Sequence, residues 1–507
     1  MFNFIDKILN RITMYRLVLY YLLGIWLIAL GLAFFGILPL SPLAMIVSLG
    51  FILAVSWIAN VIFARIFAVP TNAESYFITA LILALIISPL SPSSGFDYLW
   101  FMAFAALWAI ASKFILAIRG KHIFNPAAAA VVLTAATVGQ SASWWIGNAY
   151  LALPVFLGGL LIVRKIRRTD LAISFFAAAA ASIVLPGLAR GTDLWTILNN
   201  TLFHSPLLFF AFVMLTEPLT TPPRRTGRIF YGVLVGILFS PAFHLGSLYL
   251  TPELALIIGN IFSYIISPKQ KLILRLEEIF PLGPDLWELV FASDKKFNFR
   301  PGQYLEWTMG QDKPDRNGNR RYFTIASSPT ENRLRIGVKG NNGKSSFKQA
   351  LLGMKRGDTI VASQLAGDFT LPKDKGEKLV FIAGGIGITP FRSMIKYMLD
   401  REERRDAILF YSSKTPQELA YRNIFDSAAQ LGIRTIYSAT EQKTPSLAWC
   451  QRGRIDDQAI CSELPDFRER TYFISGPQGM VTGYKKMLRG LGIPARQIKT
   501  DYFPGFV

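Results

Sequence analysis

Apolar and polar positions follow two different patterns along this chain, and the change comes near residue 270. Before that point long apolar runs recur, and ten of them approach the length that a helix needs to cross a bilayer. After it, short apolar segments alternate with turn residues and charges. We therefore expect a membrane domain of about ten transmembrane helices over residues 1–270. The expected spans are 17–38, 42–64, 75–90, 98–118, 126–140, 146–163, 171–187, 203–217, 229–248 and 251–267.

Basic residues give an independent test of this count, because cytoplasmic loops are enriched in Lys and Arg. With a cytoplasmic N-terminus, fifteen Lys and Arg residues fall in the inner segments, whereas the outer loops carry only Arg190. An even number of spans also returns the chain to the cytoplasm before its second half. The pattern predicts a multi-pass protein of the cytoplasmic (inner) membrane, embedded in the lipid bilayer, with both termini on the cytoplasmic side.

The second half of the chain contains two further patterns. Residues 271–370 read as short strands separated by turns, which is typical of a small β-barrel. Residues 371–507 alternate strands with helical stretches, which is typical of a parallel α/β sheet. The strands are expected at 272–276, 286–291, 304–307, 322–325, 334–338 and 359–362 in the barrel, and at 379–382, 407–411, 434–437 and 472–474 in the sheet.

A glycine-rich turn follows the first strand of the expected parallel sheet. Gly384, Gly385 and Gly387 stand between an apolar run and a helical pattern that starts at Pro390. Such a turn lets backbone N–H groups approach a pyrophosphate, and the helix N-terminus stabilises the negative charge. Because nucleotides bind at the carboxyl ends of parallel strands, the turn predicts a nucleotide site.

Composition narrows the possible functions. The net charge of +20 divides equally between the two halves, which indicates basic loops beside an anionic membrane surface and no nucleic-acid partner. The two cysteines, Cys450 and Cys461, form no CxxC pair and exclude a four-thiolate iron–sulfur cluster within this chain. We expect no metal site.

Motifs in the second half resemble those of the ferredoxin–NADP reductase superfamily. They begin with RPGQY at 300–304 and continue with RYFTIASS at 321–328. The resemblance implies FAD in the barrel domain, with Arg321 paired to phosphate and the Tyr322 ring packed on the isoalloxazine. It also places the Thr324 hydroxyl near flavin N5, which accepts the hydride. Further flavin contacts are expected from Ile325, Gly343, Ser345 and Ser346.

The same resemblance assigns NAD(P)H to residues 371–507. Relatives often carry Cys beside the nicotinamide where this chain has Ser475, and they end in an acidic–x–Phe element that Asp501 and Phe503 match. We expect Thr324 and Ser475 as the catalytic positions. The predicted cofactor contacts are Gly384, Gly385, Gly387, Thr389, Gly476, Pro477, Met480, Asp501 and Phe503.

The choice between NADH and NADPH stays open. Ser413, Lys414 and Arg422 follow one strand and could contact a 2′-phosphate, while no acidic residue comes directly after that strand to favour NADH. A solvated surface explains the two basic residues equally well.

Three polar segments, Thr71–Glu74, Lys121–Pro126 and Thr216–Pro218, interrupt the apolar half at its expected cytoplasmic face. The second segment with the alanines that follow it, KHIFNPAA, the TEP of the third with its following Thr, Pro and Arg, and the ten spans resemble the membrane family that contains the B subunit of the sodium-pumping NADH:quinone reductase and the D subunit of the Rnf complex. The resemblance implies FMN or riboflavin within the bundle. Relatives esterify FMN to a Thr in an SGATPL motif, and the matching loop here, 189–194, reads ARGTDL. Thr192 could be the acceptor, but the Ala and Pro are missing, so we expect a bound, unattached flavin.

These patterns predict a flavin-dependent NAD(P)H oxidoreductase that passes electrons through FAD to a transmembrane carrier. The final acceptor is expected to be an extracytosolic flavoprotein or a membrane quinone. One alternative is a haem protein of the ferric-reductase or NADPH-oxidase type, which needs paired axial histidines, whereas this chain has only His122, His204 and His244. Another is a transporter or anchor with a regulatory reductase domain.

Overall fold

The computed structural model describes residues 5, 9, 12–67, 73–91, 95–118, 121–245, 248–267, 271–310, 318–340, 345–441 and 447–501. The chain forms two compact units, Met1–Lys269 and Gln270–Val507. Each unit has a hydrophobic core of its own.

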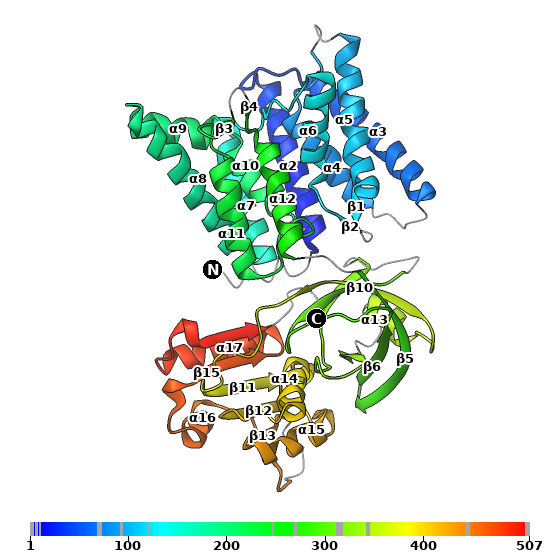
Figure 1. Ribbon diagram of the computed structural model, residues 1–507, viewed down its shortest axis with the longest axis vertical. Helices are drawn as coiled ribbons and strands as arrows, with labels where there is room; N and C mark the ends of the chain where they lie inside the picture. Colours follow the sequence, from blue (N-terminus) through cyan, green and yellow to red (C-terminus); the bar gives the residue numbers. More distant parts are fainter. Residues whose placement is uncertain are drawn as a thin grey trace. The chain divides into compact units, whose positions relative to one another are not determined.

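The first unit is helical (Figure 1). Five of its described helices are long and apolar enough to cross a membrane: α2 (Met14–Phe34), α3 (Pro42–Ile66), α5 (Phe96–Ile115), α7 (Ala149–Ile166) and α8 (Thr169–Ala189). The others are α4 (Ala73–Ile86), α6 (Pro126–Val138), α9 (Leu194–Phe203), α10 (Leu207–Phe209), the π-helix η1 (Phe210–Met214), α11 (Arg225–Leu238) and α12 (Pro252–Ile266). Short strand pairs are formed by β1 (Ala117–Ile118) with β2 (Lys121–His122), and by β3 (His244–Leu245) with β4 (Leu248–Tyr249).

Every expected span overlaps one of these helical segments, but several of them are short. The pair formed by α9 and the α10–η1 segment bends by 58° at a break, so that these helices make at most one broken span. By length and composition five to six described segments qualify as spans. A unit with at least five apolar helices of spanning length is therefore observed among the described residues, and ten crossings stay a prediction.

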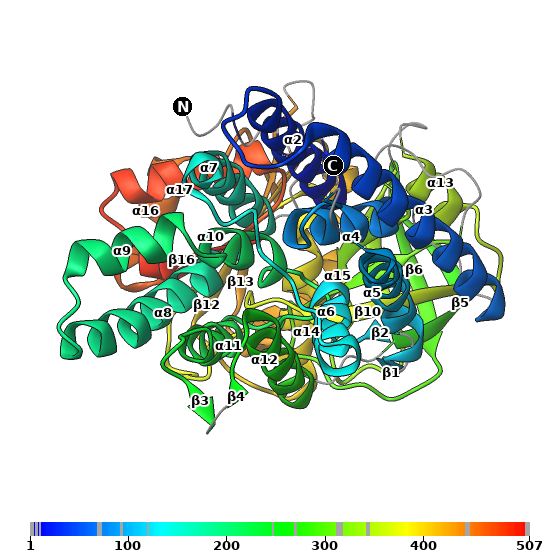
Figure 2. The ribbon, with the colours of Figure 1, turned by 90° about the horizontal axis from the view of Figure 1, so that it is seen from above.

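Glycines set the closest helix packing in this unit. On α11, a Cβ at Gly232 would lie 2.2 Å from Ser174 Oγ, and one at Gly236 would lie 2.6 Å from the Phe175 carbonyl oxygen. Both contacts are with α8, which lies beside α11 in Figure 2. Small residues let helix backbones approach in this way where no hydrophobic effect drives association in lipid.

The second unit begins with a six-stranded antiparallel sheet. Its strands are β5 (Lys271–Gly283), β6 (Leu286–Ser293), β7 (Tyr304–Thr308), β8 (Arg320–Thr324), β9 (Leu334–Lys339) and β10 (Thr359–Ala366), in the order β8-β7-β10-β5-β6-β9. Each strand predicted for this region has a counterpart. Among the described residues no ladder joins β8 to β9, so closure into a barrel stays a prediction. The short helix α13 (Ser346–Leu352) follows β9.

A parallel sheet completes the unit, with the order β14-β13-β12-β11-β15-β16. The prediction missed two short edge strands, β14 and β16. The strands are β11 (Leu379–Gly384), β12 (Ala407–Ser413), β13 (Arg434–Ala439), β14 (Cys450–Arg452), β15 (Thr471–Ser475) and β16 (Ile498–Asp501), and the helices are α14 (Thr389–Asp400), α15 (Arg422–Ser427), α16 (Asp457–Glu463) and α17 (Gln478–Gly490).

Both faces of β11 are apolar, which explains why helices cover both sides of this sheet. Phe381 faces one core with Phe391, whereas Val380 and Ile382 face the other. The strand order reverses between β11 and β15, and ligands bind at such a switch point in open parallel sheets.

Candidate functional site

A cavity of about 890 Å³ opens at the carboxyl ends of β11, β12 and β15 and extends to β8 and β9 of the antiparallel sheet. Its size is typical of a small-molecule site. The cavity therefore lies at the switch point and is bounded by both sheets. It brings together these predicted positions: Tyr322, Thr324, Gly384, Gly385, Gly387, Thr389, Ser475, Gly476, Pro477, Met480 and Asp501.

Two turns meet at one side of the cavity because glycines leave them room. A Cβ on Gly387 would lie 2.5 Å from the Ser475 carbonyl oxygen and 2.6 Å from Gly476 Cα. A Cβ on Gly384 would lie 2.1 Å from Met480 Sδ. Gly385 has φ of +53°, in the left-handed region that favours glycine. These turns line the cavity, and their backbone fits a pyrophosphate, whose oxygens need close approach to N–H groups.

The two predicted catalytic positions enter the same cavity from different sheets. Thr324 ends β8, where it pairs in register with Tyr304 of β7. Ser475 ends β15, where it pairs in register with Asp501 of β16. An in-register parallel pair places Asp501 beside Ser475 at the carboxyl edge, although the two are far apart in sequence.

Tyr322 is held by a neighbouring strand. Its hydroxyl donates a hydrogen bond to Glu306 Oε2 at 2.8 Å, and its ring meets the Tyr304 ring edge-on at 5.6 Å. These contacts fix the aromatic ring at the cavity wall. A flat aromatic face in that position suits packing against a flavin ring.

Arg321 does not line the cavity. Its Nη1 donates to the carbonyl oxygens of Gly318 at 3.0 Å and Arg320 at 2.8 Å, and its guanidinium lies 5.2 Å from the centre of the Phe347 ring. Ile325 is buried in the antiparallel sheet. Ser345 caps α13, and Ser346 begins that helix. Gly343 and Phe503 lie outside the described residues.

The cavity is also lined by charged residues that sequence reasoning did not single out: Lys339, Lys348, Glu418, Arg454 and Asp456. Lys339 Nζ lies 3.3 Å from Glu418 Oε2. Burial lowers the pKa of Lys348, and the carboxylate of Asp285 opposes this shift. Isolated charges at strand and helix ends carry no sequence signal that separates a cavity wall from a solvated surface.

The structure separates the residues considered for a 2′-phosphate. Ser413 and Lys414 line the cavity at the end of β12. Arg422 does not, because its guanidinium lies 3.5 Å from the centre of the Trp449 ring and pairs with Asp426 at 3.6 Å. Only the first two remain suitable for nucleotide contact.

Polar motifs of the membrane unit converge on Glu217. His122 Nε2 lies 3.2 Å from Glu217 Oε1, and Asn125 Nδ2 donates to Glu217 Oε2 at 3.0 Å. The Asn125 amide N–H donates to Asn260 Oδ1 at 2.8 Å, and Asn260 Nδ2 donates to the Tyr231 hydroxyl at 3.0 Å. The second and third polar segments of the sequence thus form one network, which reaches α12 and α11.

Thr192 lies elsewhere in that unit, in the turn between α8 and α9. Its amide N–H donates to the Gly187 carbonyl oxygen at 3.0 Å, and its side chain is exposed. The next residue, Asp193, caps α9 through the Thr196 amide. Across the part of the chain that the structure describes, no three His, Cys, Asp or Glu side chains gather as metal ligands would.

Two family models match separate parts of the chain. Residues 145–271 match the NQR2, RnfD, RnfE family, and residues 381–486 match the oxidoreductase NAD-binding domain. Both predicted resemblances are thereby confirmed. Together with the apolar helices, the first match indicates a multi-pass membrane protein.

Curated relatives match the second unit. A flavohemoprotein of Pseudomonas putida is 28% identical over 205 residues, which make up 40% of this chain and 50% of that protein. A glycine betaine monooxygenase reductase subunit of Pseudomonas aeruginosa is 26% identical over 224 residues, 43% of this chain and 60% of that protein. This chain spans about half the length of the curated relatives it matches. These relatives support an oxidoreductase.

Among solved structures, the flavohem-like FAD/NAD-binding domain of nitric oxide dioxygenase from Vibrio cholerae is similar to this chain. The match covers 46% of this chain and 97% of that chain, with 18% identity and a TM-score of 0.40.

Proposed function

We propose that the chain is a membrane-bound flavin-dependent NAD(P)H oxidoreductase. Electrons from cytosolic NAD(P)H would pass through FAD to a carrier in the membrane unit, and from there to an extracytosolic flavoprotein or a quinone. The observation that carries this proposal is the shared cavity, in which two glycine turns of a parallel sheet face Tyr322 and Thr324 of an antiparallel sheet.

Each side of the cavity has a separate task in this proposal. Tyr322 and Thr324 orient the flavin, and the turns at Gly384–Gly387 and Ser475–Pro477 orient the nucleotide. Bound FAD supplies the atom that accepts the hydride of NAD(P)H, so that the nucleotide is oxidised while the flavin is reduced. The protein needs no general acid or base for that transfer, because proximity and orientation supply most of the acceleration.

Arg321 would hold the flavin from behind the cavity wall. Arg321 is 3% exposed as a residue, so its charge is shielded from solvent next to β8 and α13. A phosphate placed there would receive charge-assisted hydrogen bonds, which are worth about 1.5–3 kcal/mol each. Ser345 and Ser346 stand at the start of the same helix and would contribute hydroxyl and backbone donors.

In the membrane unit we propose a bound FMN or riboflavin as the carrier. The match over residues 145–271 supports it, since that family match includes the Thr192 loop and Glu217 of the polar network. The proposed topology places both termini and the second unit in the cytoplasm, where NAD(P)H is available.

Arg321→Ala in the full-length protein tests the assignment. We expect FAD content, measured as released flavin per chain, to fall at least tenfold, because one or more bonds of about 1.5–3 kcal/mol are lost. Arg333→Ala is the matched control, since Arg333 lies directly before β9 in the same unit and pairs with Glu277, with side chains that are 47% and 30% exposed. Full FAD content and full NAD(P)H oxidation in Arg321→Ala would refute the flavin site.

A further inference from the structure

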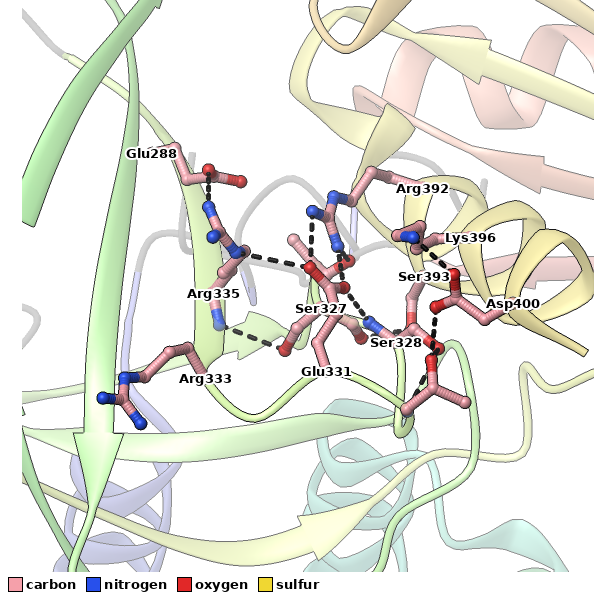
Figure 3. Close-up of polar contacts among 12 residues, drawn as sticks. Glu288, Ser327, Ser328, Glu331, Arg333, Arg335, Arg392, Ser393, Lys396 and Asp400 are labelled. Carbon is pink, nitrogen blue, oxygen red and sulfur yellow. Dashed lines mark hydrogen bonds and ion pairs between the residues drawn. The ribbon is translucent and has the colours of Figure 1, made fainter. Parts of the chain in front are cut away.

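A chain of alternating charges links the antiparallel sheet to the helix that follows the glycine turn (Figure 3). Arg392 of α14 donates to both carboxylate oxygens of Glu331, Nη1 to Oε2 and Nη2 to Oε1, and the Nη2–Oε1 distance is 3.0 Å. Arg335 of β9 approaches the same carboxylate, with Nε 3.4 Å from Oε1. Arg335 Nη1 lies 2.6 Å from Glu288 Oε2 on β6. Two arginines and two glutamates thus balance each other.

Backbone contacts tie one loop into this network. Arg392 Nη1 donates to the Ala326 carbonyl oxygen at 3.0 Å, and Ser393 Oγ donates to the Ser327 carbonyl oxygen at 2.6 Å. The Ser328 amide donates to Glu331 Oε2 at 2.6 Å. This loop comprises residues 326–331 and begins two positions after Thr324, the last residue of β8. Figure 3 shows the loop between Arg335 and α14.

Helix α14, which carries Arg392, also adjoins the cavity, because its first residue, Thr389, lines it. Helix α14 begins at Thr389, directly after the turn that contains Gly385 and Gly387. A Cβ on Gly337 of β9 would lie 2.7 Å from Thr389 Cγ2 and 2.9 Å from Ile386 Cδ1. The nucleotide turn therefore rests against the strand that carries the network, and any shift of α14 along β9 moves that turn.

Stability alone does not account for an ionic link at this place. Arg392 is 4% exposed and Glu288 is 5% exposed, and removing such charges from water offsets most of their attraction. Apolar side chains of similar volume would hold two surfaces together as well. A bidentate guanidinium–carboxylate pair differs from an apolar contact because it permits one relative orientation and one distance.

We propose that Arg392 and Glu331 are positioning residues that set the separation between the nucleotide turn and the flavin-binding end of β8. Neither residue lines the cavity, so both act through the segments they hold. This inference rests on the proposed function and adds to it the device that aligns hydride donor and acceptor. Misplacement of reacting groups by about 1 Å costs on the order of a hundredfold in rate.

The sharpest test replaces the pair by apolar residues, Glu331→Met with Arg392→Met. The double variant removes one positive and one negative charge and leaves Arg335 with Glu288, so we expect it to fold. We expect flavin reduction at saturating NAD(P)H, followed by stopped-flow absorbance, to slow at least about tenfold. FAD content and nucleotide dissociation constant should stay within about twofold, because cavity-lining groups are unchanged.

Hydrogen–deuterium exchange of the full-length protein supplies a readout that does not depend on turnover. Residues 326–331 and 389–398 should both exchange faster in the double variant, since the Ser328 amide loses its acceptor Glu331 and the Ala326 carbonyl oxygen loses the hydrogen bond that ties it to α14. Arg470→Met is the matched control. Arg470 holds Asp406 with both Nη atoms, at 2.7 and 3.1 Å, and is 7% exposed, but it precedes β15 at the amino edge of the sheet, opposite the cavity. This control should leave exchange of both segments and the reduction rate unchanged.

If the double variant does not fold, Arg392→Lys replaces it as the test, because lysine keeps the positive charge but cannot form the bidentate pair with Glu331. The same slowing with retained FAD and nucleotide affinity is expected for it. Wild-type reduction rates and wild-type exchange in whichever variant folds would overturn the inference. Wild-type protein that holds no FAD or oxidises no NAD(P)H would instead overturn the proposed function.

Discussion

Gly387 lies where two loops of the parallel sheet approach most closely, and the contact is between backbones. Met480, which faces Gly384, has a flexible side chain that can turn aside, whereas Ser475 and Gly476 meet Gly387 with main-chain atoms that cannot. We therefore expect Gly387→Ala to separate the two turns and raise the KM for NAD(P)H at least about tenfold, equivalent to about 1.4 kcal/mol. Steady-state kinetics measure this change.

Gly490→Ala is the control for that substitution. Gly490 ends α17, and a Cβ there would meet no atom within 4 Å. Alanine in a helix favours folding by up to about 1 kcal/mol over glycine, so this variant should keep its KM and its stability. A normal KM in Gly387→Ala would contradict the assignment of the turn.

Lys414 offers a second prediction at this scale. It lines the cavity beyond the end of β12, where the ribose of a nucleotide held by the β11 turn is expected. Lys414→Asp should lower the ratio of kcat/KM for NADPH to that for NADH by about tenfold or more, because a carboxylate repels the 2′-phosphate and can accept a hydrogen bond from a 2′-hydroxyl.

The direction of this change does not depend on which nucleotide the wild type prefers. Arg422→Asp provides the comparison, since the Arg422 side chain lies on Trp449, outside the cavity lining. Equal effects of the two substitutions would mean that general surface charge, not local contact, sets the ratio.

Sequence motifs identified those site residues whose position follows from the strand directly before them in the chain. The glycine turn and Ser475 follow strands that the apolar pattern makes plain, so their place at a carboxyl edge could be inferred. The approach of Asp501 to Ser475 depends on strand order, which periodicity does not encode. The Arg392–Glu331 pair was missed for the same reason, because the partners lie 61 positions apart and neither belongs to a recognised motif.

Among the elements, strands with apolar alternation were the most predictable. Strands β5 to β13 and β15 each overlap the expected segment, although the segment expected at 322–325 runs one residue beyond the end of β8. Strands β14 and β16 were missed because strands of three and four residues are too short to show a period. Helices of the first unit were located by their apolar runs. Their lengths were less predictable, since α6 and α12 end well before a full span.

The polar network of the membrane unit permits a prediction about elements. Glu217 accepts a hydrogen bond from Asn125 and lies 3.2 Å from His122 Nε2, and it thereby connects the β2–α6 segment to the residues that follow η1. Glu217→Ala leaves the Asn125 amide without that acceptor, and an unsatisfied buried polar group costs about 1–3 kcal/mol. We expect the thermal midpoint of the detergent-purified protein to fall by several degrees.

Glu74→Ala is the reference for that experiment. Glu74 pairs with Arg16 at 2.7 Å, and Arg16 is 32% exposed, whereas Asn125, which donates to Glu217, is 3% exposed. Such ion pairs contribute about 0–1 kcal/mol, so the midpoint should change little. An equal fall of the thermal midpoint in the two variants would show that the hydrogen bonds to Glu217 stabilise the protein no more than an ordinary ion pair does.

At the scale of the whole molecule, the chain joins two units that resemble different families. The change from long apolar runs to short alternating segments made this division visible in the sequence, and the two family matches fall on opposite sides of it. The electron carrier proposed for the first unit was harder to predict from the sequence. A flavin in a helix bundle is held by shape and by scattered polar contacts, and neither leaves a period or a fixed spacing in the sequence.

Flavin analysis of the purified protein tests how the two units work together. We expect two flavins per chain, FAD from the second unit and FMN or riboflavin from the first. Both should remain in solution after acid precipitation, because the Thr192 loop lacks the Ala and Pro of the attachment motif. Thr192→Ala should leave both amounts unchanged, since the exposed side chain of Thr192 then holds no bond to flavin. Flavin in the acid pellet of the wild type, lost in Thr192→Ala, would instead establish covalent attachment. FAD as the only flavin recovered would remove the carrier from the membrane unit, and electrons would then have to leave the second unit directly to a separate partner.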